Sequence, residues 1–299
     1  MEKIWQKQYQ VGVPHEIDPK SYASVVEMFI QSVERFPSLP AFSNFGSEIS
    51  YSELGRLSLQ FAVFLQQLGL RKGDRVAIML PNLLQYPVCL FGILRGGFTV
   101  VNVNPLYTPR ELKYQLQDSG AKAIIILENF AEKLQQVRKE VAVEHIVLTK
   151  MGDALAFPKS VLINLVIKYI KKMVPAYALP GALSYKQALQ RGAQAKFKEV
   201  VIGHDDLAFL QYTGGTTGVA KGAELTHKNI IANVLQASAW VSPLLKEGKE
   251  TVITALPLYH IFSLTANCLL FMRLGGLNYL ITNPRDMPGF IKELKKVKF

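Results

Sequence analysis

Cysteine is scarce in this chain of 299 residues, which contains only Cys89 and Cys268. Two cysteines exclude a disulfide-stapled scaffold, and both lie in apolar stretches, which predicts reduced residues in the core of a cytosolic protein. The N-terminal residues are polar and lack the apolar run that a secretory signal needs. Hydrophobic residues still make up 49% of the chain, enough for a large core, which excludes a disordered or collagen-like protein.

Uninterrupted apolar runs of membrane length are also missing. Residues 76–94 and 251–272 carry no charge, but Pro81 and Pro87 interrupt the first run, and Pro257 and Asn267 interrupt the second. A helix facing lipid has no water to satisfy the backbone groups that a proline frees. Each run therefore predicts a buried strand, a turn and a buried helix rather than a membrane span.

Acidic residues are absent between Asp153 and Glu199, so residues 154–198 form a basic, acid-free insertion. This window holds eight of the basic side chains in a chain whose net charge is +11: Lys159, Lys168, Lys171, Lys172, Lys186, Arg191, Lys196 and Lys198. Nucleic acid and an anionic membrane surface are the two partners that such charge attracts. No helix-turn-helix, zinc-ligand or RNA-binding pattern accompanies the charge, so we expect a membrane surface and no nucleic acid.

Inside this window, the spacing predicts a helix over residues 161–173, capped by Ser160 and stopped by Pro175. Asn164, Lys168 and the pair at 171–172 form one polar stripe, and the remaining apolar face is wider than a surface helix needs. Two interpretations follow: a helix that lies in the headgroup region of a membrane, or a basic loop packed on the domain.

Elsewhere the pattern alternates between strands and helices. Apolar runs predict strands at residues 75–80, 98–103, 122–127 and 145–148, and helical periodicity predicts helices at 22–36, from 50, after Thr108 and at 130–138. Ser50 and Thr108 each stand three residues before a glutamate, as in a capping box. The sequence therefore predicts an α/β fold of alternating βα units, with mainly parallel sheets covered by helices, resuming at Asp206 after the basic window.

The densest chemical signal lies at residues 209–222, where an apolar strand enters a loop rich in glycine and threonine. The loop supplies four glycines, three threonine hydroxyls and one lysine: Gly214, Gly215, Gly218, Gly222, Thr213, Thr216, Thr217 and Lys221. Backbone N–H groups, hydroxyls and one ammonium group are the donors that cradle a polyphosphate. Ala220 precedes Lys221 and Gly222 follows it, so this is not a Walker A loop. A simple glycine turn is the alternative, but it explains only one or two of these glycines.

Residues 212–222 resemble the signature loop of the adenylate-forming enzymes, which include acyl-CoA synthetases, luciferases and peptide-synthetase adenylation domains. Residues 256–262 resemble the next core motif of that superfamily, and residues 51–54 and 73–77 fit it as well. Residues 104–112 and 118–121 resemble a stretch shared by long-chain acyl-CoA synthetases, and the chain is most similar to bacterial long-chain-fatty-acid–CoA ligase. It departs from the pattern at Ala220, where proline is usual, and at Glu224, where an apolar residue is usual.

The resemblance implies a ligase that uses ATP, Mg²⁺ and CoA to convert a long-chain fatty acid first to an acyl-adenylate and then to acyl-CoA. It implies phosphate binding by Tyr212, Thr213, Gly214, Gly215, Thr216, Thr217, Gly218, Lys221 and Gly222. Thr213 would also supply a magnesium ligand. The implied catalytic residues are Lys221 and His260, with His260 near the substrate carboxylate; a satisfied core histidine is the alternative for His260. The expected location is cytoplasmic, peripheral on the inner face of the membrane.

The later motifs of the family lie beyond Phe299. The resemblance therefore implies that residues 1–299 form an incomplete large N-terminal, AMP-binding domain, without the small C-terminal domain. We expect this chain alone to be inactive and to expose apolar surface. Two alternatives stay open: a ligase for an aryl or short-chain carboxylate, and a non-catalytic remnant that binds nucleotide or membrane.

Overall fold

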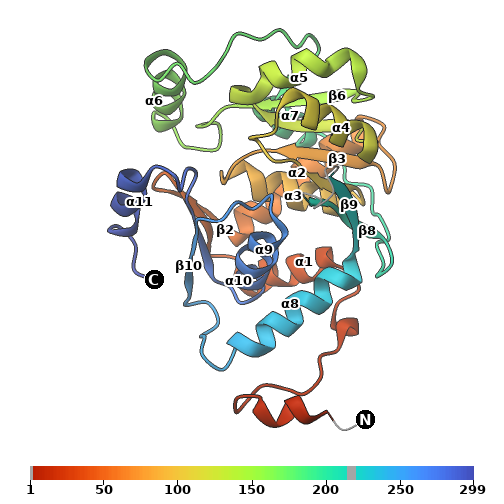
Figure 1. The fold of residues 1–299 in the computed structure, drawn as a ribbon, viewed down its shortest axis with the longest axis vertical. Helices are drawn as coiled ribbons and strands as arrows, with labels where there is room; N and C mark the ends of the chain where they lie inside the picture. The colour runs from red at the N-terminus through yellow and green to blue at the C-terminus, as the bar shows by residue number, and fades with distance from the viewer. Residues whose placement is uncertain (1–2, 214–219) are drawn as a thin grey trace.

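Two β-sheets share one body of helices in the computed structural model, which describes residues 3–213 and 220–299 (Figure 1). The strands are β1 Pro40–Asn44, β2 Ser47–Ser50, β3 Arg75–Met79, β4 Thr99–Asn102, β5 Ala123–Leu127, β6 His145–Thr149, β7 Leu183–Ser184, β8 Leu207–Thr213, β9 Lys221–Thr226, β10 Thr251–Thr254 and β11 Leu277–Leu280. The α-helices are α1 Val25–Arg35, α2 Tyr51–Gln67, α3 Gln85–Arg95, α4 Pro109–Ser119, α5 Ala131–Val137, α6 Lys159–Leu165, α7 Tyr185–Gly192, α8 His227–Val241, α9 Ile261–Ser263, α10 Leu270–Arg273 and α11 Met287–Leu294. Two π-helical segments, η5 Val166–Ile170 and η6 Leu264–Leu269, continue α6 and join α9 to α10, and the short 3₁₀ turns are η1 Ile4–Gln8, η2 Pro19–Ser21, η3 Glu128–Phe130 and η4 Arg138–Glu140.

The larger sheet has seven strands in the order β7-β6-β5-β3-β4-β8-β9, all parallel to their neighbours except β9. Its central strands are buried on both faces, as the uninterrupted apolar run of β5 predicts. One face packs on α4 and α5, and the other packs on α1, α2, α3 and α7. The predicted α/β fold with mainly parallel, helix-covered sheets is confirmed.

The smaller sheet has four strands in the order β10-β11-β1-β2 and joins distant parts of the chain. β1 runs parallel to β11 and antiparallel to β2. The Asn44 side chain donates a hydrogen bond to the Leu280 carbonyl at 2.9 Å. This sheet and one face of the seven-stranded sheet contribute to the same apolar core, so the two sheets are not independent units.

Helix ends follow the capping predictions at Thr108 and Ser50 and contradict them at Ser160. Thr108 and Glu111 form a full capping box at the start of α4, and the Ser50 hydroxyl accepts from the Glu53 N–H. The helix of the basic window instead begins at Lys159 with Pro158 as its N-cap, and Ser160 is buried within its first turn. Its last regular residue is Ile170, and Lys172 adopts a left-handed backbone with φ of 50°, so the helix ends before Pro175 is reached.

The first uncharged run forms a buried strand and a buried helix, β3 and α3, as predicted. The second forms a strand, a turn and a helix, β10 and α9 to α10, but β10 is mostly half-buried and Phe262 of α9 is exposed, so the predicted burial is wrong for that strand. Within residues 3–213 and 220–299, the structure contains no helix that is both long enough and apolar enough to cross a membrane. Cys89 and Cys268 are both buried and unpaired, in agreement with the predicted core positions.

A buried histidine joins the N-termini of α1 and α8. His227 is the first residue of α8, and its Nδ1 atom accepts a hydrogen bond from the Val25 N–H, 3.1 Å away, at the start of α1. Burial lowers the pKa of His227 from its ordinary value of 6.5 to about 4, although the nearby Asp206 carboxylate acts in the opposite direction. The neutral ring therefore satisfies an N–H group that has no partner inside its own helix.

We expect this joint to make folding pH-dependent. Between pH 6.5 and about 4 the unfolded chain protonates His227 and the folded chain does not, so the free energy of unfolding decreases as the pH falls through this range. The loss amounts to at most about 3 kcal/mol. His227→Gln should flatten the pH dependence of the urea midpoint in this window, whereas His15→Gln, at an exposed site, should not. Equal slopes for wild type and His227→Gln would contradict the assignment.

Candidate active site

The predicted phosphate loop joins two antiparallel strands, β8 and β9. Thr213 ends β8 and pairs in register with Lys221, which begins β9, so the two residues face each other at the mouth of the hairpin. Both are exposed, and among the described residues no carboxylate pairs with the Lys221 ammonium group. Gly214, Gly215, Thr216, Thr217 and Gly218, which were predicted to bind phosphate, lie outside the described residues.

The sequence interpretation missed strand β9. It took the loop as running directly into the helix capped by Thr226, but Lys221–Thr226 forms a six-residue edge strand first. The motif is polar and contains a glycine, so it lacks the apolar run by which the other strands were predicted. As the last strand of its sheet, β9 exposes Lys221 and Glu224, which is typical of protected edges. The same position explains why Glu224 is tolerated where the family usually has an apolar residue.

Tyr212 and Gly222 form a close-packed base beneath the loop. They are paired in register, and a Cβ atom on Gly222 would lie only 2.9 Å from the Tyr212 ring. The Tyr212 hydroxyl donates to the Asp118 carboxylate at 2.5 Å. Burial, followed by the effect of Asp118, raises the pKa of Tyr212 well above its usual range, so the hydroxyl keeps its proton. Both residues were predicted to bind the cofactor; the structure gives them contacts that support the strand ends beside the loop.

His260 lies at the start of α9, in the segment that follows β10. Its Nδ1 atom accepts from the Phe262 N–H at 3.4 Å, and the side chain is exposed. The alternative of a core histidine is therefore wrong. Phe262 is 59% exposed, so it is not a core residue either, whereas Tyr259 is half-buried.

A buried series of side-chain hydrogen bonds connects the His260 segment to strand β8. The Tyr86 hydroxyl lies 2.6 Å from Asn102 Oδ1, and Asn102 Nδ2 donates to Gln211 Oε1 at 3.1 Å. Gln211 Nε2 in turn donates to the Tyr259 carbonyl at 3.0 Å. Asn102 and Gln211 meet because they are register partners on the adjacent strands β4 and β8. This last hydrogen bond joins Tyr259, the residue before His260, to Gln211, the residue before Tyr212.

Asn82 holds the same segment from the other side. Its amide donates to the carbonyls of Thr254 and Leu256 at 2.9 and 3.0 Å and accepts from the Leu258 N–H at 2.8 Å. Sequence reasoning did not identify Asn82, Tyr86, Asn102 or Gln211 as site residues. The available signal was a polar side chain inside or beside an apolar strand run, because a buried amide needs a partner.

The arrangement at the hairpin mouth fits an anion and a small hard cation. The Lys221 ammonium group and the Thr213 hydroxyl are donors without a competing carboxylate among the described residues. Within the same residues, no group of three or more histidine, cysteine, aspartate or glutamate side chains comes together as a metal cage. Mg²⁺ is usually held by one or two protein oxygens together with substrate phosphates, so the exposed Thr213 hydroxyl fits the ligand role predicted for it.

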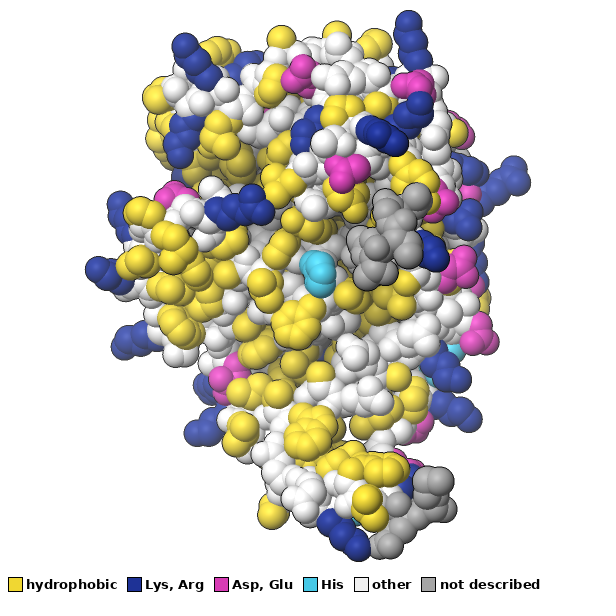
Figure 2. All heavy atoms as spheres, in the orientation of Figure 1, with side chains coloured by type: hydrophobic (Ala, Val, Ile, Leu, Met, Phe, Trp, Pro, Cys, Tyr) yellow, Lys and Arg dark blue, Asp and Glu magenta, His cyan; other side chains and the backbone are white. Residues whose placement is uncertain are grey.

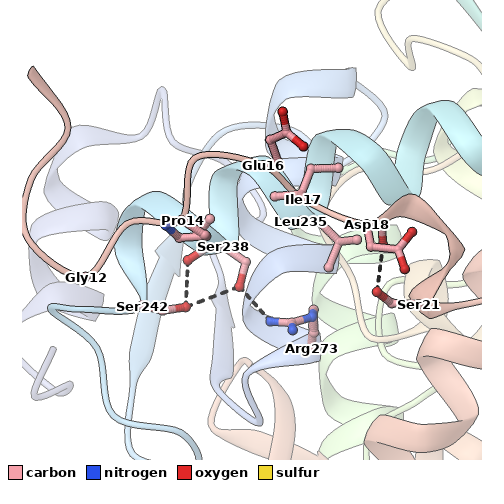
Figure 3. Close-up of a pocket in the computed structure, with 11 residues that line it drawn as sticks. Gly12, Pro14, Glu16, Ile17, Asp18, Ser21, Leu235, Ser238, Ser242 and Arg273 are labelled. Atoms are coloured by element: carbon pink, nitrogen blue, oxygen red, sulfur yellow. Dashed lines mark hydrogen bonds between the residues drawn. The ribbon is translucent and has the colours of Figure 1, made fainter. Parts of the chain in front are cut away.

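A cavity of about 300 Å³ lies away from these residues, between the N-terminal segment and α8 (Figure 3). Pro14, Ile17 and Leu235 give it apolar walls, and Arg273 lies at its base, where it donates to the Ser238 hydroxyl at 2.6 Å. None of the sequence-predicted site residues lines this cavity.

Comparison with known proteins matches the family described as AMP-binding enzyme to residues 29–299. The chain is 59% identical over 300 residues to a long-chain-fatty-acid–CoA ligase of Escherichia coli O157:H7, covering all of this chain and 54% of that protein. It is 36% identical over 278 residues to the protein of the same name from Bacillus subtilis, covering 92% of this chain and 49% of that protein. The chain thus spans about half the length of these relatives.

Solved structures show the same fold at low sequence identity. The anthranilate CoA ligase in complex with anthranoyl-AMP superposes with a TM-score of 0.78 at 20% identity, covering 94% of this chain and 50% of that one. A long-chain-fatty-acid-CoA ligase from Archaeoglobus fulgidus superposes with a TM-score of 0.74 at 23% identity, covering 96% and 53%.

Proposed function

This chain belongs to the AMP-binding enzyme family, and from that premise we propose that it serves the ATP-dependent activation of a long-chain fatty acid to acyl-CoA. The observation that supports this proposal most directly is the β8–β9 hairpin, which presents Thr213 and Lys221 side by side at the ends of the glycine-rich loop. The 59% identity to a long-chain-fatty-acid–CoA ligase supports the choice of acid.

The proposed reaction has two steps. A carboxylate oxygen of the fatty acid attacks the α-phosphorus of ATP, and pyrophosphate leaves; the thiol of CoA then loses its proton and attacks the acyl carbon, and AMP leaves. In the first step negative charge builds up on the leaving pyrophosphate, so fixed donors that face it lower the barrier. Lys221 contributes a full positive charge, and Thr213 and Gly222 contribute polar groups at the loop ends. The Thr213 hydroxyl would be a protein ligand of Mg²⁺, which would neutralise phosphate charge when bound.

His260 is proposed to bind the carboxylate. Its Nδ1 atom faces the Phe262 N–H, which leaves the opposite ring nitrogen directed away from the helix. That nitrogen can donate to a carboxylate oxygen and hold it for attack. The two alternatives, a ligase for an aryl or short-chain acid and a non-catalytic remnant, differ from this proposal in which acid, if any, supports turnover.

We also propose a cytoplasmic location, peripheral on the inner face of the membrane, with an anionic lipid surface as partner. The segment formed by α6 and η5 leaves apolar side chains in solvent: Leu162 is 58%, Tyr169 63% and Ile170 74% exposed. Lys168, Lys171 and Lys172 are exposed beside them, and Figure 2 shows hydrophobic and basic side chains gathered at the upper left, where Figure 1 places α6.

One side of this segment is anchored to the domain, which corrects the predicted polar stripe. Asn164 does not face solvent with the lysines; its Oδ1 atom accepts from the Gly152 N–H at 2.8 Å, and Ile163 and Ile167 pack against the core. The opposite, exposed side combines apolar groups with three lysines, which suits the headgroup region of an anionic bilayer.

We expect residues 1–299 alone to form no detectable acyl-CoA. Adenylation requires several aligned groups at once, and losing them together removes several powers of ten in rate. The test assays this chain with ATP, Mg²⁺, CoA and a long-chain fatty acid, beside a hybrid in which the chain replaces the matching half of the Escherichia coli O157:H7 ligase. We expect the hybrid to form acyl-CoA and the 299-residue chain alone to form none. Robust synthesis by the chain alone would contradict the prediction, and an inactive but folded hybrid would contradict the proposed function.

In that hybrid, Lys221→Ala should lower the rate of fatty-acid-dependent ATP–pyrophosphate exchange by at least about tenfold, because one preorganised donor is worth roughly 10²–10³ in rate. Lys228→Ala, at an exposed site on α8, is the matched control and should leave exchange unchanged. Equal exchange rates in the two variants would contradict the assignment of Lys221 to the phosphate site. Repeating the assay with short-chain and aryl acids decides which acid class is used.

Charge reversal of Lys168, Lys171 and Lys172 to glutamate should release the chain from vesicles that contain anionic lipid. Each lysine near such a surface adds about 1 kcal/mol, so the partition coefficient should fall at least about a hundredfold. Reversal of the three exposed lysines Lys292, Lys295 and Lys298 is the charge-matched control and should have a smaller effect. Co-sedimentation measures the bound fraction. If binding ignores both lipid charge and the first triple substitution, the segment does not dock on membranes.

A further inference from the structure

We propose that the buried series of hydrogen bonds from Tyr86 through Asn102 and Gln211 to the Tyr259 carbonyl fixes the His260 segment against the phosphate-loop strand, with Gln211 as the positioning residue. The effect on catalysis rests on the proposed function, whereas the effect on the segment's position does not.

The hydrogen bonds of this series all run in one direction. Each amide in the series uses its oxygen as acceptor on one side and its nitrogen as donor on the other, so the series runs one way from Tyr86 to the Tyr259 carbonyl. The first two bonds of the series are buried and the bond from Gln211 to the Tyr259 carbonyl is part-buried. Hydrogen bonds that are linked in this way strengthen one another in a low-dielectric interior.

Breaking one of these hydrogen bonds costs free energy, because its groups are shielded from water. Tyr86, Asn102 and Gln211 are buried, so water does not replace a lost partner. An unsatisfied buried polar group costs about 1–3 kcal/mol, which penalises any displacement of the segment that breaks the series. The Tyr86 hydroxyl also lies 2.9 Å from the Leu258 carbonyl, and because it carries one proton it donates either to this oxygen or to Asn102 Oδ1.

Gln211 lies next to the strand end at the hairpin mouth and also bonds the His260 segment. It directly precedes Tyr212, whose ring packs on Gly222, and it lies two residues before Thr213 at the mouth of the hairpin. Its side chain bonds the carbonyl of the residue before His260. One side chain therefore connects the two groups that the proposed reaction must hold in register, the donors for pyrophosphate and the ring for the carboxylate.

A matched control exists in the same core. Tyr185 is buried like Tyr86, but its hydroxyl has no hydrogen-bond partner within the described ranges. Tyr86→Phe and Tyr185→Phe therefore remove the same atom from the same kind of environment, and only the first removes a link in the series. Gln211→Met is the second test variant, since it keeps the length of the side chain and removes both polar atoms.

The experiment measures amide hydrogen exchange by mass spectrometry in the 299-residue chain, and the kinetics of ATP–pyrophosphate exchange in the hybrid ligase described above. In Tyr86→Phe and Gln211→Met, we expect exchange over residues 256–263 to become at least about tenfold faster, with exchange in β3 and β5 unchanged. In the hybrid, the same variants should lower kcat by about tenfold or more while KM for ATP stays within about twofold, because misplacement of reacting groups mainly affects the chemical step. Tyr185→Phe should change neither readout.

Unchanged exchange over residues 256–263 in both test variants would overturn the proposal, and so would an equal effect in Tyr185→Phe. Faster exchange with wild-type kcat would restrict the series to a structural role and refute the positioning of catalysis. If the unsubstituted hybrid is inactive, the proposed function fails, and the exchange data still decide whether the series fixes the segment.

Discussion

Two sheets that share no strand cannot be held together by a backbone ladder, and in this protein a shared apolar core and buried side-chain amides connect them. Residues 255–260, between β10 and α9, leave the four-stranded sheet, lie against β8 of the seven-stranded one and belong to no strand. Asn82 and Gln211 donate to carbonyls of this region, beside the backbone bond from Ile281 to Thr254 and the Ser263 hydroxyl bond to Leu256, and the Tyr86 hydroxyl lies 2.9 Å from the Leu258 carbonyl. Buried polar groups must be paired, so these side chains contribute to fixing the segment and the histidine at its end.

The same geometry relates the two proposed surfaces of the molecule. The basic segment follows β6 and the glycine-rich loop follows β8, and parallel strands direct their carboxyl ends to one edge of a sheet. Three strands separate β6 from β8 in the sheet order, so the two chain exits lie roughly 20 Å apart along that edge. The chain therefore leaves the seven-stranded sheet along one edge toward both segments for which lipid and phosphate contacts are proposed.

The sequence was most informative where local physics decides the structure. The run from Ala123 to Leu127 had to be a strand buried on both faces, and Thr108 with Glu111 had to start a helix. Strand β9 escaped detection because an edge strand needs no apolar pattern, and Ser160 was misplaced because Pro158 already supplies the helix start. Asn102 bonds Gln211 at a separation of 109 residues, Asn82 bonds residues that lie 172 to 176 positions later, and Gln211 bonds Tyr259 48 positions later. These partners follow only from strand order and register. Motif resemblance predicted roles for His260 and Lys221, but it did not predict the hydrogen bonds around the His260 segment.

The strand order of the smaller sheet also determines how late during synthesis this sheet can be completed. β1 lies between β2 and β11, and the Asn44 amide reaches a carbonyl 236 positions later in the chain. At synthesis rates of about 5–20 residues per second, the hairpin of β1 and β2 waits roughly 10–50 s on the ribosome before its parallel neighbour exists. The seven-stranded sheet needs only residues up to Thr226 and can assemble during that interval. The nascent chain thus exposes one edge of β1 for tens of seconds before β11 exists to cover it.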